Sequence, residues 1–457
     1  MKRSLRAASG VLLAFAASLS LPAWANPHET TLPNGLKLIV KEDRRAPSVV
    51  HMVWYRVGSM DEFDGTSGVA HVLEHMMFRG TKKVGPGEFN KIVAAAGGRD
   101  NAFTSLDYTA YFQQVPKQAL GQMMRLEADR MGNLDIRDDL FAKELEVVKE
   151  ERRLRTDDKP RGMVVEQLMA TAFQAHPYRR PIIGWMSDLD HMTAQDARDW
   201  YKRWYAPNNA TVVVVGDVDY KQVFAEAAKT YGAVKPHALP ARKPLVEPPQ
   251  NGIRRSVVKA PAELPYLAMA WRAPVLRDPR KDDEVYALSV LAGVLGGYDG
   301  ARLKARLVRE LQVAQELDVS YDDTNRGEAL FAIDGTPAPG KSMADLEAAI
   351  RSELQRLKAE GVSEDELRRV KVQIVAAQVY KRDSLMGQAM ELGMDDNVGL
   401  SWKDDDYMLE RLRQVTPAQV QAVAAKFLQD DSLSVVQLDP QPLDPKAQAR
   451  PAQPHRH

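Results

Sequence analysis

Two segments of this chain resemble each other at a constant offset of 223 residues, and this repeat limits the possible folds more than any other feature. Residues 193–205 and 416–428 each begin with a threonine and continue with the periodicity of an amphipathic helix. A hydrophobic strand follows in both places, at residues 210–215 and 433–436. Because a threonine before a helix caps its first N–H groups, both segments predict the same helix–strand unit. Duplication of a domain of about 200 residues explains the match, with chance similarity of two such units as the alternative.

Strands and helices are mixed along the chain rather than strictly alternating. Apolar alternation predicts strands at residues 36–40, 48–57 and 102–114. Helical periodicity predicts helices at residues 69–77, 88–96, 117–130 and 138–155. This order favours an α+β layer fold over a doubly wound parallel sheet.

Residues 1–25 have the pattern of a secretory signal peptide. Three basic residues precede the apolar run 11–17, and a small-x-small sequence ends at Ala25. An uncleaved membrane anchor is the alternative, but the apolar run is short for a bilayer span. We therefore expect cleavage after Ala25, export to the periplasm and no stable membrane anchor. The remaining chain has 59 basic and 62 acidic residues, a net charge of −3.

A proline-rich segment separates the two halves. Residues 235–251 contain five prolines, which is typical of a stiff, extended linker. The sequence therefore predicts domains at residues 26–234 and 252–440. Residues 441–457 are rich in Pro, Gln, Ala and Arg, which predicts a disordered tail.

Composition restricts the chemistry of the chain. Basic and acidic residues are equal at 62 each, so no overall positive field exists to bind nucleic acid. Cysteine is absent, which excludes disulfides, thiol catalysis and cysteine-ligated metals. Any bound metal must therefore be held by carboxylates and by some of the nine histidines.

Two of those histidines lie in the motif His71-Val-Leu-Glu74-His75, within a predicted helix. At about 100° per residue, His75 lies about 40° from His71 and Glu74 about 60° on its other side, so all three share one face. Two neutral imidazoles on one helix suit Zn²⁺, which leaves room for a carboxylate ligand and water. Zinc lowers the pKa of water toward neutrality, and Glu74 is placed to take the proton during attack on a peptide carbonyl. The alternative is a pair of surface histidines beside a solvated glutamate.

The histidine motif has the reverse order of the usual zincin sequence, which is the inverzincin pattern. With it, the chain resembles the pitrilysin/insulinase-type zinc metallopeptidases, and most closely their processing-peptidase-like two-domain bacterial branch. The matching residues are Gly58, Gly68–Met76, Phe78, Gly80-Thr81, Gly97-Gly98 and Asn101-Ala102-Phe103-Thr104. The resemblance covers nearly the whole mature chain and implies two homologous α/β-layer domains with mixed, largely antiparallel sheets, forming one half of a clamshell.

A third metal ligand is sought in the predicted helix 138–155. Periodicity alone does not choose between Glu150 and Glu151, although Glu144 shares a face with Glu151. The resemblance implies that Glu151 is the ligand and that Glu144 supports the site. It also implies one Zn²⁺ per chain, bound by His71, His75 and Glu151, with Glu74 as general base.

The resemblance further implies a substrate and a partner. The strand that begins at Asn101 and Ala102 would pair with an extended peptide or unfolded protein. The chain is one half of the expected clamshell, and the family's Arg/Tyr pair has no clear counterpart in it. A homodimer, or a heterodimer with a metal-free family member, is therefore expected. A catalytically silent structural or peptide-binding subunit is the rival hypothesis, as is a zinc-dependent binding protein without hydrolysis.

Overall fold

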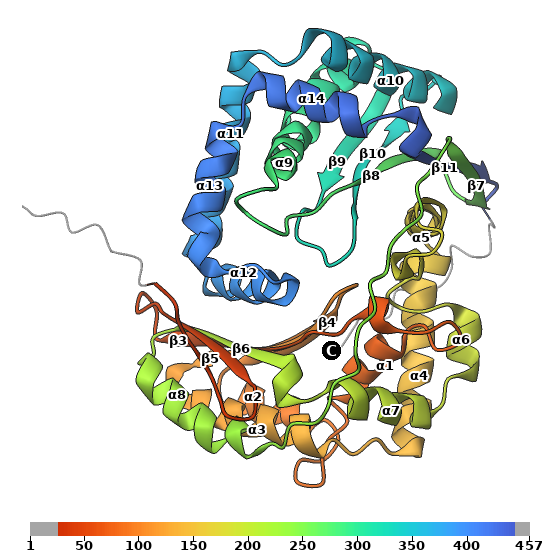
Figure 1. Ribbon diagram of the computed structural model, residues 1–457. Coiled ribbons are helices and arrows are strands. Elements are labelled where there is room, and N and C mark those ends of the chain that lie inside the picture. The colour runs from red at the N-terminus through yellow and green to blue at the C-terminus, as the bar shows by residue number, and fades with distance from the viewer. Residues whose placement is uncertain (1–25, 444–457) are drawn as a thin grey trace, which may run out of the picture.

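Two mixed β-sheets, one in each half of the chain, face each other across the molecule (Figure 1). The computed structural model describes residues 26–443. The expected signal peptide, residues 1–25, lies outside the described residues, as do residues 444–457 of the expected tail. Within residues 26–443, none of the helices combines the length and apolar composition that a membrane crossing requires.

The first sheet has the strand order β1-β2-β6-β3-β5-β4, which leaves β4 at an edge. Strands β2 and β6 are parallel, and the other neighbours are antiparallel. The strands are β1 (His28–Thr31), β2 (Lys37–Glu42), β3 (Ser48–Tyr55), β4 (Arg99–Thr104), β5 (Thr109–Pro116) and β6 (Ala210–Gly216). The helices of this half are α1 (Val69–Met76), α2 (Glu88–Ala95), α3 (Leu120–Asn133), α4 (Asp138–Arg152), α5 (Pro160–Ala172), α6 (Met186–His191), α7 (Ala194–Trp204) and α8 (Tyr220–Lys229).

The second sheet has the order β7-β11-β8-β10-β9, in which β7 and β11 are parallel. Its strands are β7 (Arg254–Pro261), β8 (Tyr266–Ala273), β9 (Ala314–Tyr321), β10 (Ala329–Pro337) and β11 (Leu433–Gln441). The helices are α9 (Asp283–Gly296), α10 (Met343–Glu360), α11 (Glu364–Asp383), α12 (Leu385–Val398), α13 (Asp405–Gln414) and α14 (Pro417–Phe427).

The two halves repeat the same arrangement. Helix α14 has the bounds of α7 displaced by 223 residues, and each is capped by its threonine, Thr193 or Thr416. The order β2-β6-β3-β5-β4 of the first sheet corresponds to β7-β11-β8-β10-β9 of the second. The predicted fold class, two homologous α/β layers with mixed and largely antiparallel sheets, is therefore confirmed.

Each half also contributes one helix to the open face of the other half's sheet (Figure 1). Helix α12 packs on β3 and β6, where Ala389 and Leu392 meet Met52 and Trp54 in one buried cluster. Helix α5 packs on the second sheet in the same way. Strand β3 is consequently buried on both faces, since Val53 and Tyr55 on its other face lie in the core of the first half. Burial of these apolar side chains holds the two halves together.

Gly393 allows the close approach of α12 to the first sheet. A Cβ atom at this position would lie 2.1 Å from Cε2 of the buried Trp54. We expect Gly393→Ala to destabilise the protein by about 1–3 kcal/mol, because the indole has no space to move. Gly121→Ala in α3 is the matched control: its Cβ would lie 3.4 Å from the flexible end of Arg125, and removing a helical glycine stabilises by about 0.5–1 kcal/mol. Urea unfolding measures both, and equal stability of the two variants would contradict this packing.

Two predicted elements differ from the structure. Residues 102–114 form a hairpin rather than one strand: β4 and β5 pair from Thr104↔Thr109, and the turn closes with Ser105 N–H donating to the Tyr108 carbonyl. The alternation continues through this short turn, so the pattern hides it. The helix expected to reach residue 155 ends at Arg152 and continues as a wider π-helical turn, Arg153–Asp157.

The segment between the halves contains neither helix nor strand from residue 235 to 251. Glu247 anchors it, since its carboxylate accepts hydrogen bonds from the backbone N–H groups of Gln174, Ala175 and His176 at 2.7–2.8 Å. Strand β11 continues to Gln441, one residue into the expected tail.

Candidate metal centre

Helix α1, which bears the histidine motif, is held at its N-terminus by a carboxylate. Gly68 precedes the helix with a φ of 89°, and a Cβ there would lie 2.5 Å from the carbonyl oxygen of Ile183, so only glycine fits. Gly68 offers no capping side chain. The buried Glu62 instead accepts hydrogen bonds from the N–H groups of Gly68 and Ala70, both at 2.9 Å. This cap fixes the helix and the direction of its side chains.

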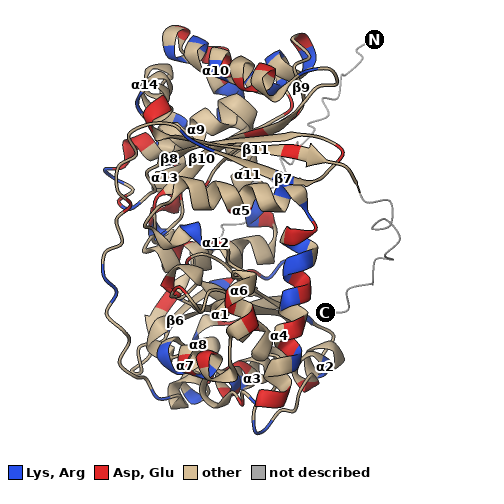
Figure 2. Cartoon of the chain, turned by 90° about the vertical axis from the view of Figure 1, so that its right-hand side faces the viewer, with Lys and Arg blue, Asp and Glu red and all other residues tan. Residues whose placement is uncertain are grey.

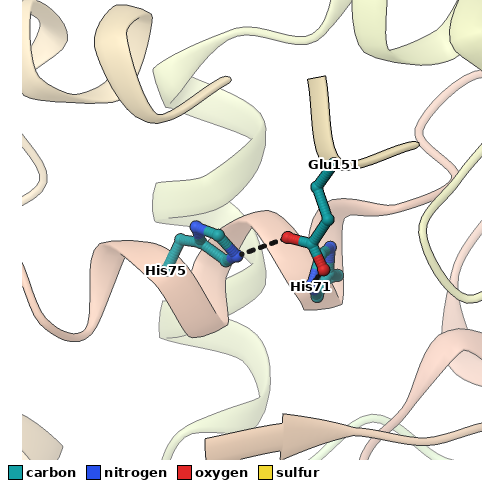
Figure 3. Close-up of side chains that lie close together, drawn as sticks. All are labelled: His71, His75 and Glu151. Carbon is teal, nitrogen blue, oxygen red and sulfur yellow. Dashed lines mark ion pairs between the residues drawn. The ribbon is translucent and has the colours of Figure 1, made fainter. Parts of the chain in front are cut away.

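His71 and His75 on α1 meet Glu151 at the end of α4 (Figure 3). Nε2 of His75 lies 3.3 Å from Oε2 of Glu151, and Nε2 of His71 lies 3.7 Å from Oε1. One donor atom from each side chain lies within 4.8 Å of the others. Among the residues that the structure describes, this is the only group of three or more histidine and acidic side chains close enough to share a metal ion.

The charge states of two members suit a metal ligand. Burial lowers the pKa of His71 to about 3, with repulsion from His75 as a smaller cause, so its imidazole is neutral near pH 7. Burial opposes ionisation of Glu151. The hydrogen bond from His75 and the nearby positive charges outweigh it and lower the pKa of Glu151 to about 2. Glu151 is therefore an anion across the physiological range.

His75 behaves differently and leads to a testable prediction. Burial opposes its protonation, but the carboxylates of Glu144 and Glu151 outweigh that effect and raise the pKa of His75 to about 9. Without zinc, His75 is thus protonated at pH 7, whereas a ligand imidazole must be neutral. Zinc binding at pH 7 is expected to release about one proton per chain, and zinc affinity to rise with pH up to about pH 9. Calorimetric titration in buffers of different ionisation enthalpy measures this release; a binding enthalpy independent of the buffer would contradict it.

Glu144 lies two helical turns before Glu151 in α4 and contacts the cluster at His75. Its Oε2 lies 3.5 Å from Nδ1 of His75, the ring nitrogen that faces away from Glu151. Nη2 of Arg79 donates a hydrogen bond to the same carboxylate at 2.9 Å, and Nε of Arg79 forms an ion pair with it at 2.8 Å. A carboxylate behind a histidine orients the ring and makes it a better ligand. Glu150 and Glu146 are exposed on the outer side of α4, where they pair with Arg153 and Lys149.

Glu74 lies beside the cluster and is buried. Its Oε2 accepts a hydrogen bond from Oγ1 of Thr104 at 2.5 Å, which ties α1 to the end of the edge strand β4. Burial raises the pKa of Glu74, while the Thr104 hydrogen bond and the charge of His75 oppose that rise. The carboxylate is therefore more basic than a carboxylate in water, which suits a proton acceptor.

The structure places Asn101 and Ala102 on the edge strand β4. Asn101 is exposed and Ala102 is half-buried. The side-chain Oδ1 of Asn101 accepts a hydrogen bond from the N–H of Ala102 at 2.8 Å. The side chain of Asn101 thus occupies the backbone N–H of Ala102 on β4. Asn101 lies three residues before Thr104, which hydrogen-bonds Glu74.

Among the described residues of the second half, 252–443, there is no counterpart of the cluster. Helix α9 packs against α11 and α14 as α1 packs against α4 and α7. Its buried side chains are mainly apolar, and it carries no histidine. The three candidate ligands therefore form the one candidate metal site within residues 26–443.

Three residues that shape this site had no predicted role in it: Arg79, Arg155 and Thr104, the last of which lies in the motif Asn101-Ala102-Phe103-Thr104. Nη1 of Arg155 lies 2.7 Å from Oε1 of Glu151. Its position four residues after Glu151 is a recognisable helical ion-pair spacing. Thr104 and Arg79 are distant in sequence from their partners on other elements, so no local pattern reveals them.

Known families match consecutive parts of the chain. The family "Insulinase (Peptidase family M16)" matches residues 37–185, which include the whole metal cluster. The family "Peptidase M16 inactive domain" matches residues 191–374.

Individual proteins match over most of this chain. The zinc protease PqqE of Helicobacter pylori is 34% identical over 378 residues, which are 81% of this chain and 84% of that protein. The crystal structure of a protease from Helicobacter pylori has a TM-score of 0.86 at 31% identity and covers 91% of this chain and 100% of that chain. The periplasmic protease PqqL of Escherichia coli shares the fold, with a TM-score of 0.78 at 22% identity, over 92% of this chain and 49% of that chain. This chain belongs to the insulinase family of peptidases, peptidase family M16.

Proposed function

We propose that the chain is an exported zinc endopeptidase that hydrolyses peptide bonds in unfolded proteins or oligopeptides. The observation that carries the proposal is the convergence of His71, His75 and Glu151, with the buried carboxylate of Glu74 beside them. The donor set fits zinc, because two imidazoles and one carboxylate are ligands that catalytic zinc sites use. We propose one zinc ion per chain, held by these three side chains in the domain 26–234, with the metal-free domain 252–440 joined by the linker 235–251.

When bound, zinc supplies a Lewis acid that polarises the scissile carbonyl and makes water more acidic. Glu74 acts as general base: its carboxylate takes a proton from the attacking water and passes it to the leaving amine. Thr104 holds Oε2 of Glu74, so that Oε1 is free to face water. Glu144 and Arg79 keep the ring of His75 in place during this step.

We propose that an extended peptide binds by pairing with β4. This strand is the edge of the first sheet, and it ends at Thr104 beside Glu74. An edge strand offers unpaired backbone groups to an added strand. Asn101 and Ala102 would then contact the substrate backbone.

Asn101→Ala tests this role. We expect kcat/KM for a peptide to fall up to about tenfold, as one lost hydrogen bond predicts, with zinc content unchanged. A quenched fluorescent peptide and metal analysis measure the two quantities. An unchanged or higher kcat/KM would show that Asn101 does not contact the substrate and only hydrogen-bonds the N–H of Ala102.

A partner is part of the proposal. The match to about half of PqqL suggests that a second half-clamshell completes the enzyme. We propose a homodimer, or a heterodimer with a metal-free family member. Charged residues of both signs are interspersed over the helices of both halves, as Figure 2 shows, which fits a peptide substrate rather than nucleic acid.

The silent-subunit alternative is weakened by Glu74. A subunit that only binds peptides has no need of a buried carboxylate next to three metal-ligating side chains, and all four residues are present. The match to "Peptidase M16 inactive domain" begins at residue 191, after the cluster.

Peptide cleavage tests the proposed function. Residues 26–457 are incubated with a quenched peptide library before and after removal of metal by a chelator, and after zinc is restored. Cleavage that disappears with the chelator and returns with zinc is expected. Absence of cleavage by the zinc-loaded chain, alone and mixed with a metal-free family member from the same genome, would favour the silent subunit.

A further inference from the structure

Arg155 contacts the candidate ligand Glu151. Its guanidinium contacts Oε1 of Glu151 at 2.7 Å, whereas Oε2 of the same carboxylate faces Nε2 of His75 at 3.3 Å. Oε1 also faces Nε2 of His71 at 3.7 Å, so the contact of Arg155 is the shorter of the two contacts at that oxygen. The side chain of Glu151 is 11% exposed and that of Arg155 is 66% exposed.

The backbone holds Arg155 in this position. Arg155 lies in the π-helical turn that follows α4, closed by a hydrogen bond from the N–H of Asp158 to the carbonyl of Arg153. Gly162 at the start of α5 packs directly on this turn, because a Cβ there would lie 2.6 Å from the carbonyl oxygen of Arg155. Irregular turns of this kind are frequent at functional sites.

We propose that Arg155 is a positioning residue for the zinc site: it holds Oε1 of Glu151 and thereby presents Oε2 as the ligand atom. This inference rests on the proposed function, in which Glu151 binds zinc. Supporting groups that hydrogen-bond a ligand carboxylate fix its orientation and raise metal affinity. The guanidinium suits this task because it stays charged at every physiological pH and offers several N–H groups in a fixed plane, of which Nη1 makes the contact here.

Zinc affinity of three variants tests the proposal. Competition with a chromophoric chelator at fixed pH is expected to show about tenfold weaker zinc binding for Arg155→Gln. Arg155→Lys should recover part of the affinity, since it restores the charge without the planar guanidinium. Arg153→Gln is the matched control: it lies in the same turn and pairs at 3.0 Å with Glu150, which is 56% exposed and outside the cluster. Its zinc affinity should equal that of the unaltered chain.

A second measurement separates positioning from folding. The zinc-free forms of Arg155→Gln and Arg153→Gln should unfold at the same temperature, because both arginine side chains are largely exposed, at 66% and 45%, and an ion pair made by such a side chain contributes little to stability. A lower unfolding temperature for zinc-free Arg155→Gln alone would assign its effect to folding and overturn the proposal. Unchanged zinc affinity of Arg155→Gln would overturn it as well. Tighter zinc binding would show that Arg155 competes with the metal, which also contradicts it.

The variant Glu151→Gln distinguishes failure of this inference from failure of the proposed function. If Glu151→Gln loses zinc while Arg155→Gln retains it, Glu151 is a ligand and only the role of Arg155 is wrong. If Glu151→Gln itself retains zinc, the proposed ligand set and the role of Arg155 are both wrong.

Discussion

Glu74→Gln is expected to reduce peptide hydrolysis by about 10²–10⁴-fold while zinc content stays at one ion per chain. The amide has the size of the carboxylate and can still accept the hydrogen bond of Thr104 through its oxygen. It cannot take a proton from water, so the general base is lost and the metal ligands are untouched. Initial rates on a quenched peptide and elemental analysis of the same sample measure the two quantities together.

The control for this variant is Glu146→Gln. Glu146 is exposed on α4 and pairs with Lys149 at 2.9 Å, away from the cluster. Its activity and zinc content should both match the unaltered chain. A Glu74→Gln variant with normal turnover would exclude Glu74 as the base, and one that lost its zinc would place Glu74 among the ligands.

Glu151→Gln is expected to lose bound zinc, whereas Glu150→Gln is expected to keep it. A neutral amide is a much poorer zinc ligand than a carboxylate, and the side chain also holds Nε2 of His75 at 3.3 Å. Loss of affinity should exceed the roughly hundredfold that removing a supporting group costs. At limiting zinc, the peptidase activity of Glu151→Gln should fall together with its zinc affinity.

The neighbouring position makes this a matched comparison. Glu150 is on the same helix and carries the same charge, but its side chain is 56% exposed and pairs with Arg153. Metal analysis after dialysis against a weak chelator measures both variants. Zinc loss in Glu150→Gln with retention in Glu151→Gln would reverse the proposed ligand assignment.

The spacing of residues in the sequence predicted the part of the candidate site that lies on α1. His71, Glu74 and His75 are close in sequence, so helical geometry alone predicts that they share a face. Glu150 and Glu151 differ by one residue on a helix whose buried face is not known from the sequence. The packing of α4 against α1 settles the direction, because it turns Glu151 toward the histidines and Glu150 toward solvent.

Contacts between distant segments could not be read from the sequence. The repeat predicted that the two halves share one fold. It did not predict that α5 and α12 each pack on the sheet of the other half, because that packing is a tertiary contact. The turn between β4 and β5 interrupts a continuous alternation, and the register of the two strands fixes where it lies. The π-helical turn at Arg153–Asp157 packs against Gly162 of α5, and no local sequence pattern predicts this contact.

The most direct test of the zinc site is anomalous diffraction at the zinc absorption edge from crystals of the zinc-loaded chain. One anomalous peak between the side chains of His71, His75 and Glu151 is expected, with Glu74 beside it and not coordinated. Absence of a peak at this position, or a peak at other histidines such as His28 or His176, would contradict the proposed zinc peptidase site.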